Sequence, residues 1–137
     1  MKRLIIALLA LMPLFCTSSF AQLDRLKSTT NTTFSQLSTI TANNSRFFYK
    51  GDALFTGTAW SNDGRFMKII CENGVAFKIY LHHNNGRIAY IRDIKNDDTI
   101  YYYDEDGKEI TQNEFREQYK VILDKMIVVQ QEVKKKE

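Results

Sequence analysis

Turn signals recur at nearly regular intervals through the middle of this sequence, and they constrain the fold more than any other feature. The turn positions are ten to twelve residues apart, at Gly64, Gly74, Gly86, Asp97 and Gly107. Asn-Gly and Asp-Gly suit tight hairpins because both central residues can adopt positive φ. This spacing is typical of short strands joined by hairpins. We therefore predict an antiparallel β-meander of five to six short strands over residues 46–110.

The register of this meander can be worked out from its turns. A two-residue loop at Asn73-Gly74 pairs Glu72 with Val75 and Phe66 with Leu81, and the next turn pairs Leu81 with Tyr90. One face then collects the apolar residues Phe66, Ile70, Val75, Phe77, Leu81, Ile88, Tyr90 and Ile94. This face is the predicted core. Lys68 and Arg92 fall on it too, so either their stems lie along it with the charges at the rim, or a bulge shifts the register.

A helix is predicted after the meander, over residues 111–137. Thr111 and Glu114 have the spacing of a capping box, in which each side chain bonds the other residue's backbone N–H. An apolar stripe of helical period follows at Phe115, Tyr119, Ile122, Met126, Val129 and Val133. We expect this stripe to pack on the sheet, giving an α+β domain; the alternative is a homodimer through the C-terminal helix.

The residues before the meander divide into two segments. Lys2 and Arg3 precede an apolar run from Leu4 to Phe15, and small residues at Ser19 and Ala21 complete a signal-peptide pattern, with cleavage expected between Ala21 and Gln22. Twelve apolar residues are too few to cross a bilayer, which needs about 20. Residues 22–45 are rich in Ser, Thr and Asn, and we expect a weak helix or a linker there, with disorder as the alternative.

This pattern predicts a periplasmic or secreted protein without a transmembrane span after cleavage. A lipoprotein would use Cys16 as its lipid acceptor, but bulky Phe15 precedes it. Removal of Cys16 leaves Cys71 as the remaining cysteine, so no internal disulfide is expected. Cys71 lies in an apolar run, which predicts a buried strand thiol.

Charge and motifs argue against several function classes. The formal charge of +3 falls by two when Lys2 and Arg3 are removed, so no basic surface for nucleic acid is expected. His82 and His83 are adjacent, and adjacent strand residues point to opposite faces, so they would not share a metal ion. A calcium-loop alignment on Gly107 places Tyr102 and Asn113 at the anchor positions. We expect no metal, no cofactor and no catalytic residues, because nucleophile, zinc and phosphate-loop motifs are absent.

Four segments carry a family resemblance: Phe55-Thr-Gly-Thr-Ala-Trp60, Glu72-Asn-Gly74, Tyr80-Leu-His-His-Asn-Asn-Gly86 and Tyr101-Tyr-Tyr-Asp-Glu-Asp-Gly107-Lys-Glu-Ile110. They resemble variant MORN repeats of the bacterial antitoxin-repeat type, here in an exported protein. The Tyr80 to Gly86 interval is longer than the family pattern, and about two complete units are expected. The resemblance implies a glycine-punctuated sheet used as a binding or assembly surface, and it implies no catalytic residues.

Four aromatic residues are the candidate binding residues: Trp60, Tyr80, Tyr101 and Tyr103. Large rigid rings with a polar tip suit protein or sugar recognition if they are exposed opposite the core. The alternative is that they pack beneath the helices. Thr99, in Asp98-Thr99-Ile100, resembles a three-residue O-glycosylation acceptor of exported proteins, and its alternative reading is a turn before a strand.

The function predicted from these features is an exported, non-enzymatic binding or scaffold module, with an immunity- or antitoxin-like role toward another protein as its specific form. The expected partner is another protein or a cell-envelope component, and a monomer is expected. The alternative is a small exported hydrolase or a glycan-binding protein.

Overall fold

The structure is a computed structural model that describes residues 32–136. The predicted signal peptide, with its cleavage site between Ala21 and Gln22, lies outside the described residues, as does the start of the polar segment at 22–31.

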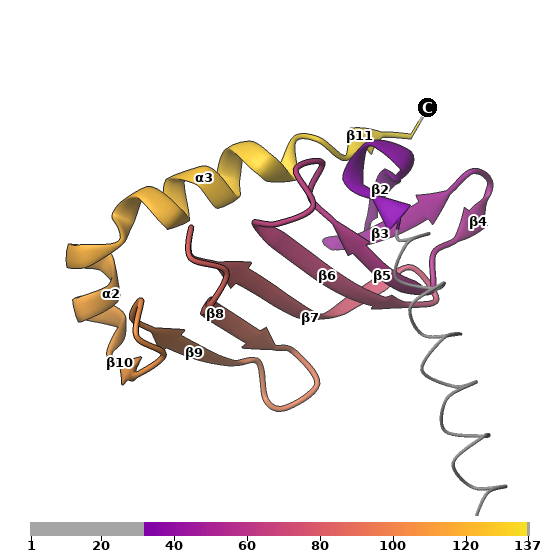
Figure 1. The fold of residues 1–137 in the computed structure, drawn as a ribbon. Helices are drawn as coiled ribbons and strands as arrows, with labels where there is room; N and C mark the ends of the chain where they lie inside the picture. The colour runs from indigo at the N-terminus through magenta and orange to yellow at the C-terminus, as the bar shows by residue number, and fades with distance from the viewer. Residues whose placement is uncertain (1–31, 137) are drawn as a thin grey trace, which may run out of the picture. The chain divides into compact units, whose positions relative to one another are not determined.

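A seven-stranded sheet forms the centre of the described domain (Figure 1). Its strands, in spatial order, are β1 (Thr32–Thr33), β5 (Gly57–Trp60), β6 (Met67–Glu72), β7 (Val75–His82), β8 (Ile88–Asp93), β9 (Thr99–Tyr103) and β10 (Glu109–Ile110). From β5 to β10 every neighbouring pair is antiparallel, and β1 pairs with β5 in parallel. The α+β class and the antiparallel meander are therefore confirmed, with more strands than the predicted five to six.

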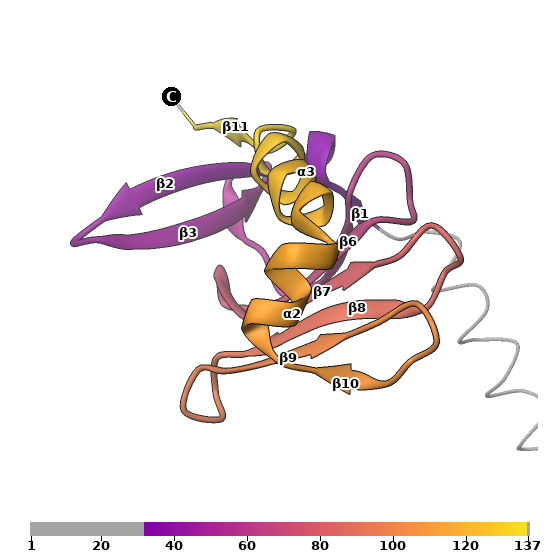
Figure 2. The ribbon, with the colours of Figure 1, turned by 90° about the vertical axis from the view of Figure 1, so that its left-hand side faces the viewer.

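A second sheet has four strands in the order β11-β2-β3-β4. They are β2 (Ser38–Ala42), β3 (Ser45–Lys50), β4 (Ala53–Leu54) and β11 (Lys134–Lys135). Figure 2 shows the β2–β3 hairpin projecting from the rest of the domain. Residues 46–54, assigned to the meander by the sequence, therefore belong to a separate sheet.

The weak helix or linker predicted over residues 22–45 is wrong for the described part of that segment. A 3-10 turn at Phe34–Gln36 precedes β2, which pairs with β3 along its full length. Asn43 and Asn44 form the connecting turn with φ of 53° and 64°, the positive values that a tight hairpin requires. Asparagine tolerates this conformation, so the turn needs no glycine, and β-branched Thr39, Ile40 and Thr41 suit the strand.

The C-terminal segment contains two helices, α2 (Gln112–Gln118) and α3 (Lys120–Gln130), instead of one helix to residue 137. The predicted capping box is present: Glu114 N–H donates to Thr111 Oγ1 at 3.2 Å. The helix breaks at Tyr119, whose φ and ψ are −130° and 32°. After α3 the chain turns and Lys134–Lys135 pair with β2, so strand pairing replaces the predicted last helical turn.

The apolar stripe packs inward, as predicted. Phe115, Val129 and Val133 are buried, and Tyr119, Ile122 and Met126 pack against the same core. Both helices lie along one face of the seven-stranded sheet (Figures 1 and 2). Within residues 32–136, no helix is long and apolar enough to cross a membrane.

The strand register agrees with the prediction at its turns and departs from it at a bulge. Glu72 lies opposite Val75, and Leu81 lies opposite Tyr90, as expected. A register shift at Ile70/Cys71 places Met67, instead of Phe66, opposite Leu81. The buried residues of β6 are therefore Met67, Ile69 and Cys71, while Ile70 lies on the other face, contrary to the prediction. Val75, also assigned to the core, is 46% exposed.

This bulge resolves the predicted conflict at Lys68, which lies on the face opposite the core. Arg92 stays on the core side, opposite Ile79, and its guanidinium is neutralised by the two carboxylate oxygens of Asp98 at 2.7 and 2.8 Å. Cys71 is buried as predicted, and burial raises the pKa of its thiol to about 12.

Gly74 connects the two sheets at the β6–β7 turn. Its N–H donates to the carbonyl of Phe55 at 2.8 Å, and its own carbonyl accepts from Phe48 N–H at 2.7 Å. Its φ is +82°, and a Cβ there would lie 2.5 Å from Leu54 Cδ2. Glycine therefore satisfies both a backbone and a packing requirement at this position.

Candidate functional site

Five side chains form a continuous line across the face of the seven-stranded sheet that is opposite the core. Consecutive members are register partners on β5 to β9, in the order Trp60, Lys68, Tyr80, Ile91 and Tyr101. We call this line the cross-strand row. Because side chains alternate between faces along a strand, the flanking residues on the same strands point into the core.

The row brings together three of the four candidate binding residues, namely Trp60, Tyr80 and Tyr101. Tyr103 lies two residues beyond Tyr101 on β9 and so shares its face, whereas the intervening Tyr102 packs on Phe115 with ring centroids 5.0 Å apart. Both helices pack on the opposite face, so the alternative that these aromatics lie beneath the helices is wrong. All four side chains remain half-exposed.

Lysine ammonium groups lie against the ring faces of the row. Lys68 Nζ is 5.3 Å from the ring centroid of Trp60 and 4.4 Å from that of Tyr80. Lys78 Nζ is 5.6 Å from the Tyr80 ring. These distances are within the range of cation–π attraction. Among residues 32–136 neither lysine forms an ion pair. Asp93 lies opposite Lys78 on β8, so Lys68 is the lysine of this face whose charge has no carboxylate opposite it in the strand register.

The surface that the row presents is therefore mixed in character. The ring faces of Trp60 and Tyr80 are turned toward Lys68, and the His82 ring also lies 5.4 Å from that of Trp60. Ring edges, phenolic hydroxyls and ammonium groups are left for an incoming molecule. Such a surface offers apolar contact and positive charge together.

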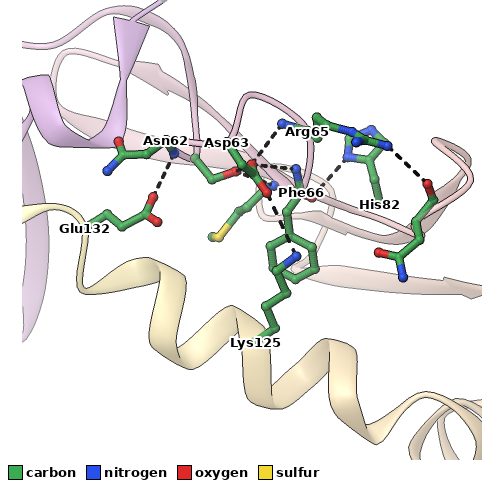
Figure 3. A network of polar contacts seen from close by, with 10 residues as sticks. Asn62, Asp63, Arg65, Phe66, His82, Lys125 and Glu132 are labelled. Atoms are coloured by element: carbon green, nitrogen blue, oxygen red, sulfur yellow. Dashed lines mark hydrogen bonds and ion pairs between the residues drawn. The ribbon is translucent and has the colours of Figure 1, made fainter.

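A polar network holds the β5–β6 loop at the Trp60 end of the row (Figure 3). Asp63 accepts hydrogen bonds from Ser61 Oγ at 2.6 Å and from the N–H groups of Arg65 and Phe66 at 2.9 and 3.1 Å. Burial alone would raise the pKa of Asp63, but these hydrogen bonds and nearby Lys125 outweigh it and hold the pKa below its usual value. The loop is thereby fixed as a rigid support.

The same network ties the loop to α3. Asn62 N–H donates to Glu132 Oε1 at 2.8 Å, and Lys125 Nζ lies 3.9 Å from Asp63 Oδ2 and 4.4 Å from the Phe66 ring centroid. A cleft of about 480 Å³ opens beside this loop, bordered by Trp60 among others.

The two histidines have separate environments, and His83 is not the surface residue that a position at a hairpin end suggests. His83 is buried, and its Nε2 lies 2.9 Å from the carbonyl oxygen of Tyr103. His82 is half-buried, with Nδ1 3.2 Å from the carbonyl oxygen of Phe66, and burial lowers the pKa of its imidazole. Among the described residues, no three His, Cys, Asp or Glu side chains are grouped so that they could hold a metal ion.

The remaining sequence candidates lie in turns. Asp104 Oδ1 accepts from the N–H groups of Asp106 and Lys108 at 2.9 Å each, which makes this acidic stretch a hairpin turn. Thr99 begins β9, and its hydroxyl donates to the carbonyl of Asn96. Its glycosylation remains a prediction.

Sequence reasoning missed two members of the row, Lys68 and Ile91, and Lys68 is the charged one. The simple register assigned it to the apolar face, because unbroken pairing from the two-residue loop places it opposite Ile79, whereas the structure pairs it with Tyr80. Its charge was the available signal, since a lysine in a predicted core indicated either a charge at the rim or a bulge.

No family model, no curated protein and no solved structure matches this chain.

Proposed function

We propose that this protein is an exported, non-enzymatic binding module and that the cross-strand row is the surface by which it contacts a protein partner. The observation that carries the proposal is the line of aromatic and basic side chains on the sheet face that the helices leave uncovered. Tyrosine and tryptophan dominate the binding energy of many protein interfaces because they combine large rigid area with a polar tip. Export rests on the signal-peptide pattern of residues 1–21.

The charge of the row favours a partner with an acidic surface. Lys68 and Lys78 lie beside the rings, and neither forms an ion pair within residues 32–136, although Asp93 lies opposite Lys78 on β8. Carboxylates of a partner can pair with these ammonium groups while its apolar side chains pack on the ring edges. The resemblance to antitoxin-type MORN repeats supports an immunity-like role toward another exported protein.

Glycan binding is less well supported by this geometry. A sugar ring stacks on an open aromatic face, but the Lys68 ammonium lies 4.4 Å from the Tyr80 ring centroid, between Tyr80 and Trp60. A sugar would have to displace the lysine from both rings. We therefore favour a protein partner, and glycan binding becomes an outcome that the experiment can detect.

The experiment is site-specific photo-crosslinking in the cell envelope of the producing organism. A benzophenone amino acid replaces Tyr80 in one variant and exposed Val121, on α3, in another. We expect a discrete protein adduct at position 80 that is absent at position 121 and is lost when Lys68→Glu is added. A polysaccharide adduct, or no adduct that depends on position 80, would contradict the proposal.

Affinity measurements with the captured partner then test the energetic role of the row. Truncation of an interface hot spot costs about 2 kcal/mol or more, which corresponds to a loss of roughly 30-fold in affinity. We expect Tyr80→Ala to show such a loss. Tyr49→Ala is the matched control, because Tyr49 also carries a lysine on its ring, Lys136 at 5.4 Å, but belongs to the four-stranded sheet. It should bind like the wild type.

A further inference from the structure

The four-stranded sheet has one face that packs on the core and one that is left uncovered. Thr39 and Phe48, which lie opposite each other on β2 and β3, are buried on the inner face. Side chains alternate between the two faces along a strand, so their neighbours in sequence point outward. The register places eight side chains of β2, β3, β4 and β11 on this outer face, and none of them is buried.

Four of these eight side chains are aromatic or large and aliphatic. Ile40 lies opposite Phe47, and Leu54 lies opposite Tyr49. Ile40 is 38% exposed and Leu54 is 46% exposed, and both rings are half-exposed. None of the four belongs to the hydrophobic core or packs against it. The outer face therefore presents a small apolar surface, much of it on the hairpin that projects from the domain (Figure 2).

Positive charge is concentrated on the same sheet. Residues 38–54 and 134–136 carry five basic side chains and one acidic side chain, a net charge of +4. Residues 55–133 carry ten basic and thirteen acidic side chains, a net charge of −3. Four of the five basic residues, all except Lys136, form no ion pair within residues 32–136. The described domain is therefore polarised, with its positive charge on the small sheet.

Lysines of the C-terminal segment border the apolar surface. Lys134 is exposed and lies on the outer face, opposite Ser38, and Lys135 is exposed at the same edge. Lys136 Nζ lies 5.4 Å from the ring centroid of Tyr49 and 3.1 Å from Asp52 Oδ1. Lysine stems can cover apolar surface while their ammonium groups reach a polar boundary. The face thus combines apolar side chains with cations at its edge.

We propose that the outer face of the four-stranded sheet docks on an anionic phospholipid membrane. Its apolar side chains enter the boundary between head groups and acyl chains, and its lysines pair with the lipid phosphates. Tyr49 suits this depth because its ring is apolar and its hydroxyl is polar. The opposite net charges of the two parts of the domain turn the small sheet toward a negative surface.

Two other occupants fit this face less well. A stable protein interface takes about 20–30 residues from each partner, whereas this face offers eight. An isologous dimer through it would bring the lysines of both copies together. A membrane requires no such area, because each inserted side chain and each lysine contributes separately. This inference does not depend on the proposed protein-binding function, which belongs to the other sheet.

Sedimentation with lipid vesicles tests the docking. The full chain is used as it is recovered from the producing cells, and all variants share its N-terminus, so differences among them report on the substituted residues. Vesicles of phosphatidylcholine alone are compared with vesicles that also contain about 30% phosphatidylglycerol, an anionic lipid. We expect partition to be at least about tenfold stronger with the anionic vesicles and to weaken at about 0.5 M salt, which screens exposed charges. Equal partition into both kinds of vesicle, or none, would overturn the proposal.

Charge variants test the role of β11. One lysine near an anionic surface raises partition about fivefold, so Lys134→Gln combined with Lys135→Gln should lower it about 20-fold. Lys108→Gln combined with Lys120→Gln is the control, because it makes the same charge change at exposed positions outside the small sheet. It should behave as the wild type. Equal losses in the two double variants would mean that net charge alone causes the binding, and the assignment would be wrong.

Apolar variants test whether side chains of the outer face enter the membrane. Ile40→Ser combined with Leu54→Ser should lower partition about tenfold, because two aliphatic side chains no longer leave water. Val75→Ser combined with Ile100→Ser is the matched control, since these residues of the large sheet are 46% and 38% exposed. Circular dichroism confirms that both variants are folded. Wild-type partition in the folded Ile40→Ser, Leu54→Ser variant would contradict insertion of this face.

Two further measurements distinguish this surface from other binding modes. Tyr80→Ala removes a ring of the cross-strand row and should leave partition unchanged; if it abolished partition, the lipid surface would be the row and the inference would fail. A benzophenone amino acid at position 47, crosslinked in the cell envelope, should give a phospholipid adduct. A discrete protein adduct without a lipid adduct would show that a protein occupies the outer face, contrary to the proposal.

Discussion

Phe115 is the residue whose truncation most directly tests how the C-terminal helices are held. Its side chain is fully buried, at 0% exposure, on the inner face of α2. Its ring centroid lies 5.0 Å from that of Tyr102 on β9 and 5.5 Å from that of Tyr119 at the helix break. The change Phe115→Ala would therefore remove the contact between α2 and the sheet.

The expected loss of stability follows from burial and from the stiffness of the surroundings. Truncation of a buried phenylalanine to alanine costs about 3–5 kcal/mol, and the cost is larger where neighbours cannot collapse into the cavity. Tyr102 and Tyr119 are held by the sheet and by His83, so we expect a value in this range. For a domain of this size that corresponds to a decrease of about 10–20 °C in Tm.

Thermal unfolding followed by circular dichroism measures this shift, at several protein concentrations. Arg116→Ala is the matched control, because Arg116 is the next residue on α2 and is exposed. We expect it to change Tm by a few degrees at most. A Tm of Phe115→Ala near the wild-type value would refute the packing argument. If the wild-type Tm rose with protein concentration, the helices would stabilise a dimer instead.

Two further predictions concern single residues in the loops. Gly74→Ala should lower the free energy of unfolding by about 1–2 kcal/mol because alanine is strained in the left-handed conformation. Contact between the added Cβ and Leu54 should lower it further. Gly86→Ala is the control with similar φ but no neighbour within 4 Å, so equal losses in urea denaturation would contradict the contact argument. Asp63→Asn should destabilise the protein at pH 7. Because the folded pKa of Asp63 is lowered, its contribution is present above the unfolded value of about 3.9 and is lost as pH falls through the folded pKa. If the stability difference between Asp63→Asn and the wild type were the same at pH 7 and well below pH 3, this argument would be wrong. Asp124→Asn, at an exposed position on α3, serves as the control.

The parts of the fold that could be predicted from the sequence are those decided by neighbouring residues. Asn73-Gly74 defines its own hairpin, and the capping box at Thr111 defines the start of a helix. The common face of Tyr101 and Tyr103 follows from strand alternation alone. These features need no knowledge of what packs against them.

The features that were missed depend on long-range packing. A bulge was one of two explanations that the sequence left open for Lys68, but its place at Ile70/Cys71 was not predicted. The break at Tyr119, which allows its ring to contact both Phe115 and His83, was not predicted either. The cleft of about 510 Å³ that the β2–β3 hairpin and the end of α3 border was not foreseen, because these two segments are far apart in the sequence. No local pattern brings segments so distant in sequence together.

The pairing of β11 with β2 has a consequence for the order in which the domain forms. Lys134 lies opposite Ser38 and Lys135 opposite Thr39, and Lys136 Nζ donates to the carbonyl of Gly51 at 2.9 Å. A ribosome delivers residues 38–51 long before residues 134–136. The β2 edge of the β2–β3 hairpin therefore stays without its β11 partner until residues 134–136 have been synthesised.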